Sequence, residues 1–179
     1  YSYAGGKIIS ELISINYGRK DFDRVCIFRP HNVYGPDMGT EHVIPELSRR
    51  AAAAIEATPT GVVPFEIQGD GSQTRAFVHI DDFVLGLEVL LNQGEHLEIY
   101  NIGNPEEVSI AELTDMVFAS LGREADIRPG NEPAGATQRR CPDINKITRL
   151  GYRPSVSLSE GLPNVVEWYA KNYGDSSDS

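Results

Sequence analysis

Residues 25–36 read VCIFRPHNVYGP. The first four residues form a short, continuous apolar run, which is typical of a strand buried on both faces of a parallel sheet. The remainder is polar and holds Pro30 and Pro36, so it predicts a loop directly after the strand. Ligands of open parallel sheets bind beyond the carboxyl ends of the strands, so this loop is a candidate wall of a binding site.

Helical patterns surround this strand. Apolar residues recur at helical spacing over residues 4–17, and Gly18 is expected to end that helix. Helical and strand-like segments go on alternating toward the carboxyl terminus, which predicts an α/β fold. The expected helices cover residues 44–57, 81–91, 109–121, 143–150 and 157–173, and the expected strands cover residues 65–68, 74–80 and 99–103.

Caps, turns and loops separate these elements. Residues 69–72, GDGS, suit a tight turn between two strands, and Gly122 is expected to stop a helix. Residues 123–142 predict mostly loop, and the tail at residues 174–179 is expected to be disordered. Capping residues are expected at three helix starts: Asp81 or Asp82, Ser109 with Glu112, and Ser157 or Ser159.

The composition is that of a soluble globular protein. Of 179 residues, 40% are hydrophobic and 23% are charged, and the net charge of -10 argues against a general nucleic-acid binder. No apolar run is long enough to cross a membrane and no leader opens the chain, so a cytoplasmic protein is expected. Cys26 and Cys141 predict free thiols, and neither a disulfide framework nor a metal site is expected.

Tyr3 and Lys7 stand four residues apart, so they share one face of the first helix. There the lysine ammonium could favour the ionised form of the phenol, whose ordinary pKa of about 10 is too high for acid–base work near neutral pH. A surface tyrosine beside a surface lysine is the simpler interpretation, and the pair alone does not decide.

Polar residues in two loops and on one strand are candidates for holding an anion or a sugar. Asn32 offers both a donor and an acceptor, although it could instead satisfy loop backbone together with His31. Arg75 carries a planar fork that suits phosphate oxygens, although it could pair with a surface carboxylate. Arg139 and Arg140 are adjacent and repel each other unless an anion or a carboxylate lies beside them.

The order of these motifs resembles the carboxyl-terminal half of the extended short-chain dehydrogenase/reductase family. The resemblance rests on YAGGK, RPHNVYGP, GDGSQTRAFVHIDD, NIGNPEE and RRCPD, followed by LGYRPSVSLSEGL. More narrowly, the chain looks like the NAD-dependent nucleotide-sugar epimerases, dehydratases and decarboxylases. The resemblance implies a partial Rossmann-like parallel sheet with a small α/β substrate-binding lobe.

The resemblance also implies roles for single residues on the cofactor side. Tyr3 would be the catalytic acid/base for a sugar hydroxyl, and Lys7 would lower its pKa and hydrogen-bond the nicotinamide ribose. Pro30 and Val33 would lie against the nicotinamide end of NAD, with NADP a less suitable cofactor. Glu11 fits the family's helix as a structural residue.

On the substrate side, the resemblance implies that Asn32 contacts a bound nucleoside-diphosphate sugar and that Arg75 and Arg140 hold its diphosphate. The reaction would begin with transient oxidation at C4 of the sugar. Residues 1–40 would form the catalytic helix, strand and loop of the Rossmann-like domain. Residues 41–173 would form mainly the substrate lobe, with residues 74–102 partly returning to the sheet.

The family's glycine-rich phosphate loop has no counterpart in the sequence. The chain is therefore expected to be inactive by itself, and to associate through exposed sheet edges with a missing amino-terminal half or another protomer. A homodimer is expected for the parent enzyme. Two alternatives remain: a binding module for nucleotide diphosphates without chemistry, and a structural α/β protein that binds no nucleotide.

Overall fold

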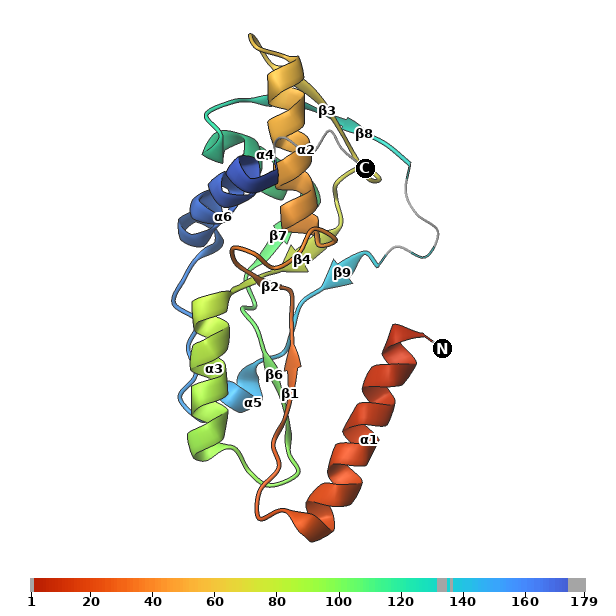
Figure 1. Cartoon of the computed structure of the whole chain (residues 1–179), viewed down its shortest axis with the longest axis vertical. Coiled ribbons are helices and arrows are strands. Elements are labelled where there is room, and N and C mark those ends of the chain that lie inside the picture. Colours follow the sequence, from red (N-terminus) through yellow and green to blue (C-terminus); the bar gives the residue numbers. More distant parts are fainter. Residues whose placement is uncertain (1, 132–134, 136, 174–179) are drawn as a thin grey trace.

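The computed structural model describes residues 2–131, 135 and 137–173, and it is an α/β fold, as the sequence predicts (Figure 1). The helices are α1 (Tyr3–Asp21), α2 (Val43–Ala57), α3 (Ile80–Gln93), α4 (Ile110–Ser120), α5 (Asn145–Thr148) and α6 (Leu158–Tyr173). The strands are β1 (Ile27–Pro30), β2 (Val33–Tyr34), β3 (Val63–Ile67), β4 (Thr74–Ala76), β5 (Val78–His79), β6 (Ile99–Ile102), β7 (Glu107–Ser109), β8 (Ala125–Pro129) and β9 (Arg139–Arg140).

Most strand pairs are parallel. β1 pairs with β6, β2 with β5, and β3 with β8, each in parallel, whereas β4 lies between antiparallel β7 and parallel β9. The turn at residues 69–72 therefore joins strands of different sheets, because β3 takes β8 and not β4 as its partner.

The prediction of a loop over residues 123–142 is wrong in part. β8 and β9 both lie in this segment, and each is stabilised by pairing with a strand far away in the sequence. Local signals from proline and glycine dominate the segment, so the sequence hides the two strands.

Two hydrophobic clusters form the core. The larger packs α2, α4 and α6 against β3, with Leu47, Phe65, Phe118 and Leu162 among its buried residues. The smaller lies around α3, α5 and β6 and includes Tyr100 and other buried residues. Figure 1 shows the two groups of elements one above the other, with β2 and β4 between them.

Helix α1 packs loosely on this body. It contributes no large side chain to the core clusters, and Ile8 and Leu12 are each 61% exposed. The prediction that Gly18 ends the helix is wrong, since α1 continues to Asp21. Gly18 is instead a packing residue, because a Cβ there would lie 2.7 Å from Cδ2 of Leu97.

Of the three predicted caps, the one at α4 is confirmed, and the one at α6 stays a prediction. Ser109 forms a capping box with Glu112 at α4, and Ser157 donates from its N–H and hydroxyl to Glu160 before α6. At α3 the prediction of an aspartate cap is wrong, because the side chain of His79 accepts the N–H of Asp81.

Asp82 is buried and binds a different segment. Its carboxylate accepts hydrogen bonds from the N–H groups of Ser155 and Val156 and from the Ser155 hydroxyl. Because Ser155 lies just before α6, Asp82 ties α3 to the start of that helix.

The tail predicted at residues 174–179 lies outside the described residues. The predicted domain boundaries stay predictions. Within the described ranges, no helix is long and apolar enough to span a membrane.

Candidate active site

The register of three short strands decides where the arginines point. In the parallel pair of β4 and β9, Thr74 lies opposite Arg139 and Arg75 lies opposite Arg140. Successive side chains of a strand point to opposite faces of a sheet, whereas cross-strand partners share a face. Arg75 and Arg140 therefore project from one face, and Thr74 and Arg139 from the other.

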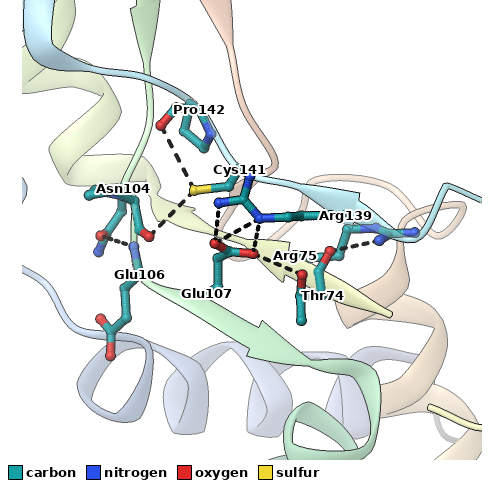
Figure 2. A network of polar contacts seen from close by, with 9 residues as sticks. Thr74, Arg75, Asn104, Glu106, Glu107, Arg139, Cys141 and Pro142 are labelled. Carbon is teal, nitrogen blue, oxygen red and sulfur yellow. Dashed lines mark hydrogen bonds and ion pairs between the residues drawn. The ribbon is translucent and has the colours of Figure 1, made fainter. Parts of the chain in front are cut away.

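Arg139 is neutralised on its own face. Its guanidinium donates to both carboxylate oxygens of Glu107, with a shortest distance of 2.6 Å between Nη2 and Oε1. The Thr74 hydroxyl donates to the same carboxylate at 2.8 Å (Figure 2). The repulsion expected between Arg139 and Arg140 is thus relieved by a carboxylate on one side only.

Arg75 and Arg140 line a cleft with the polar loop after β1. A cavity of about 190 Å³ contains both arginines together with Asn32 and Val33. A second cavity of about 450 Å³ contains the same two arginines and extends along α2 toward Gln68. We call these two cavities together the arginine cleft. The structure therefore brings together the three residues that the sequence assigns to substrate binding.

The arginine cleft holds both guanidiniums beside two carboxylates, since Glu41 lines both of its cavities and Glu46 lines one. Within the described residues, neither Arg75 nor Arg140 forms an ion pair, whereas Arg29, Arg50, Arg128 and Arg139 each do. Burial lowers the pKa of Arg75, and the nearby charge of Arg140 lowers it further. Two like charges placed this close favour an anion between them.

The start of α2 adds to this character. Its N-cap residue, His42, forms no capping hydrogen bond from its side chain, and His42, Val43 and Ile44 all line the arginine cleft. A helix amino terminus presents free N–H groups and the positive end of the helix dipole, both of which stabilise an anion.

Asn32 combines a structural contact with a place in the cleft. Its backbone is left-handed, with φ of 43°, and its Nδ2 donates to the carbonyl of Ala76 at 2.8 Å. Its own carbonyl accepts the N–H of Val78. Asn32 therefore fixes the loop after β1 to β4 and β5, and it lines the arginine cleft from that position.

Tyr3 and Lys7 lie on a separate groove that adjoins this region. Lys7 Nζ lies 5.3 Å from the centre of the Tyr3 ring, and Tyr3 is 83% exposed. Both residues line a groove of about 660 Å³ between α1 and β1, here called the α1 groove. Pro30 lines this groove and also a cavity of about 440 Å³ that contains Asn32 and Arg140. Val33 lines the arginine cleft and is not among the residues of the α1 groove.

One contact that the sequence does not reveal holds α1 beside β1. Arg29 donates from Nε and Nη2 to the two carboxylate oxygens of Glu11, each at 2.7 Å. The hydrogen bonds from Arg29 lower the pKa of Glu11. Glu11 thus has the structural role expected of it, but nothing near it in the sequence identifies Arg29 as its partner.

Glu107 and Thr74 are further residues that sequence reasoning missed. Glu107 stands in the NIGNPEE motif, and Thr74 directly precedes Arg75, but their contact with Arg139 depends on strand pairing. Among the described residues, no group of three or more His, Cys, Asp and Glu side chains is arranged to hold a metal ion.

Comparison with known proteins identifies the family. Residues 1–103 match the NAD dependent epimerase/dehydratase family, which is more than half of the chain. The chain is 36% identical to GDP-L-fucose synthase 1 of Arabidopsis thaliana over 80% of its own length and 45% of the relative. It is 34% identical to UDP-glucuronic acid decarboxylase 2 of the same plant, over 98% of the chain and 38% of the relative.

Solved structures agree with this match. A dTDP-glucose 4,6-dehydratase from Streptomyces venezuelae with NAD bound is 36% identical, has a TM-score of 0.77, and is matched over 96% of this chain and 52% of that one. A UDP-glucose 4-epimerase from Thermotoga maritima, solved with UDP-glucose, is 25% identical, with a TM-score of 0.81 over 94% of this chain and 53% of that one.

The chain belongs to the NAD dependent epimerase/dehydratase family and has its Rossmann-like α/β fold. It spans about half, or less, of the length of the relatives that it matches.

Proposed function

We propose that the whole protein acts on a nucleoside-diphosphate sugar with NAD as its cofactor, and that this chain binds the sugar nucleotide. The observation that carries the proposal is the pair of guanidiniums, Arg75 and Arg140, which line one cleft and form no ion pair with the residues that the structure describes. Relatives named for acting on GDP-, UDP- and dTDP-linked sugars support the substrate class.

In this proposal the diphosphate lies in the arginine cleft. The forks of Arg75 and Arg140 hold its oxygens, since a planar guanidinium matches two phosphate oxygens at once. The free N–H groups at the start of α2 add to the attraction. Asn32, fixed by its bond to Ala76, faces the sugar that continues from the diphosphate toward Pro30.

The α1 groove suits the nicotinamide end of a dinucleotide. It is open, it is lined by Tyr3, Lys7 and Pro30, and it offers the Lys7 ammonium as a hydrogen-bond donor to a ribose. When bound, NAD supplies a hydride acceptor for transient oxidation at C4 of the sugar. NAD is preferred to NADP, because several of the related structures hold NAD and one holds NADPH.

Tyr3 moves the proton in this reaction. As a phenolate it takes the proton of a sugar hydroxyl, as a phenol it later returns that proton, and the Lys7 ammonium stabilises the phenolate form. The relatives include a decarboxylase, a dehydratase and an epimerase, so the proposal covers the oxidation that these reactions share and leaves the later step open.

Calorimetry of this chain with UDP, dTDP and GDP tests the binding proposal. For whichever nucleotide binds, Arg140→Ala should lower the affinity by about tenfold or more, which corresponds to the loss of one charge-assisted hydrogen bond. Arg128→Ala is the matched control, because Arg128 pairs with Asp126 and does not line the cleft. Equal affinities of the two variants for every nucleotide would remove the proposed site.

We also propose that the protein forms a homodimer through the outer side of α1. Ile9, Leu12 and Ile13 are each more than half exposed and do not line the α1 groove, whereas the side of α1 that lines the groove is mainly polar. A helix with such an exposed apolar stripe is unfavourable in a monomer. In sedimentation velocity of the whole protein, Ile9→Glu with Ile13→Glu should give monomers. A dimer that survives both changes would exclude this surface.

A further inference from the structure

The strand that carries Arg140, β9, is very short. β9 contains two residues, and its pairing with β4 includes one hydrogen bond from the N–H of Thr74 to the carbonyl of Gln138. So short a strand does not fix its own register, because a slip of one residue would exchange the faces of Arg139 and Arg140. Another contact must decide which arginine faces the cleft.

Glu107 supplies that contact. Glu107 lies on β7, and its carboxylate accepts hydrogen bonds from the guanidinium of Arg139 on β9 and from the hydroxyl of Thr74 on β4. One side chain therefore joins all three strands. Figure 2 shows Glu107 between these two residues. The hydrogen bonds from Arg139 and then from Thr74 lower the pKa of Glu107, which keeps the carboxylate ionised.

We propose that Glu107, supported by Thr74, is a positioning residue for the diphosphate site: it retains Arg139 on one face of the β7-β4-β9 sheet and thereby directs Arg140 to the face of Arg75. This inference rests on the proposed function, because it assumes that Arg75 and Arg140 bind the diphosphate. Glu107 acts through the strand and does not contact the ligand.

The sign of one mutation separates positioning from simple electrostatics. Glu107→Gln removes a negative charge near the cleft, so electrostatics alone would tighten the binding of an anion. If Glu107 has a positioning role, loss of its ion pair with Arg139 would instead allow β9 to shift its pairing with β4. Arg140 would then no longer be held toward Arg75, and anion binding would weaken. Glu106→Gln is the matched control, since it makes the same change of charge one residue away, on a side chain that points away from Arg139 (Figure 2).

The test is calorimetry of the chain with inorganic pyrophosphate, which carries the proposed anion without a nucleobase. Glu107→Gln should weaken binding about tenfold, the equivalent of one charge-assisted hydrogen bond, and Glu106→Gln should leave the affinity equal or slightly higher. The exchange of charges in Glu107→Arg with Arg139→Glu should restore most of the loss. Equal or tighter binding by Glu107→Gln would overturn the proposal.

Two controls keep this result separate from other failures. If the wild-type chain and Arg140→Ala bind pyrophosphate equally, or neither binds it, the proposed function fails. If Arg140→Ala loses affinity while Glu107→Gln keeps it, only the positioning role fails. Should Glu107→Gln not fold by circular dichroism, Thr74→Val decides: it removes one hydrogen bond to Glu107 and should weaken binding about threefold, and wild-type affinity would refute the role.

Discussion

Asp82 offers a quantitative test of how the two parts of the fold are joined. Its side chain is 2% exposed and accepts the N–H groups of Ser155 and Val156 as well as the Ser155 hydroxyl, at 2.9–3.0 Å. Asp82→Ala removes the acceptor from all three donors. A hydrogen bond to a charged group contributes about 1.5–3 kcal/mol when its partner cannot reach water.

The expected loss is smaller than the sum of these contributions. Ser155 is exposed and Val156 is half-buried, so water can replace part of what the carboxylate provides. We expect Asp82→Ala to lower the free energy of unfolding by about 2–4 kcal/mol. The measurement is urea denaturation followed by circular dichroism, with the slope of the transition checked for a change in compactness.

Asp81→Ala is the matched control. Asp81 precedes Asp82 in the first turn of α3, carries the same charge relative to the helix dipole, and has a side chain that is 79% exposed. Its removal should cost less than about 1 kcal/mol. If the two variants lose the same stability, or if Asp82→Ala loses under about 1 kcal/mol, the joining role of Asp82 is wrong.

Two further predictions concern packing and pH. Gly86→Ala should destabilise the chain by about 1–3 kcal/mol in the same urea assay, because its Cβ would lie 2.6 Å from Cγ2 of Ile102. Gly6→Ala, whose Cβ would meet nothing within 4 Å, should be neutral or stabilising by up to about 1 kcal/mol, and the reverse order would contradict the packing. Hydrogen bonds from the N–H and hydroxyl of Ser109 lower the pKa of Glu112 in the folded chain. The contribution of Glu112 to the stability of the fold is therefore complete above its pKa in the unfolded chain, and it is lost as the pH falls through the lower pKa of the folded chain. Glu112→Gln should therefore flatten the fall of the melting temperature in acid, and an unchanged acid limb would argue against this cap.

Local patterns in the sequence predict much of the fold. The sequence predicts a parallel strand near residue 25 correctly, but β1 covers Ile27–Pro30, enters the predicted loop and is not buried on both faces, because Phe28 is 45% exposed. Ser109 with Glu112 forms a capping box as its spacing indicates. These features depend on residues close together in the chain. The same reasoning gives the wrong cap for α3. Aspartate is a commoner N-cap than histidine, so the sequence favours Asp81 or Asp82, but the imidazole of His79 accepts the N–H of Asp81.

Features that depend on distant pairing were not predictable. β8 is stabilised by its parallel partner β3, and the turn of residues 69–72 joins two sheets for the same reason. Arg75 and Arg140 line one cleft, and the role that the resemblance implies for them stays a prediction. The carboxylate partner of Arg139 could not be predicted from the sequence. Glu107 lies 32 residues away and contacts Arg139 only because of how three strands pair.

Hydride transfer in the whole protein tests the central claim most directly. We predict that NADH forms when NAD and the bound nucleoside-diphosphate sugar are mixed with the wild-type protein, and that Tyr3→Phe abolishes this signal while the affinity for the nucleotide is retained. Near-normal NADH formation by Tyr3→Phe would contradict the role of Tyr3. Nucleotide binding by the wild-type protein without any NADH would favour a binding module over an enzyme.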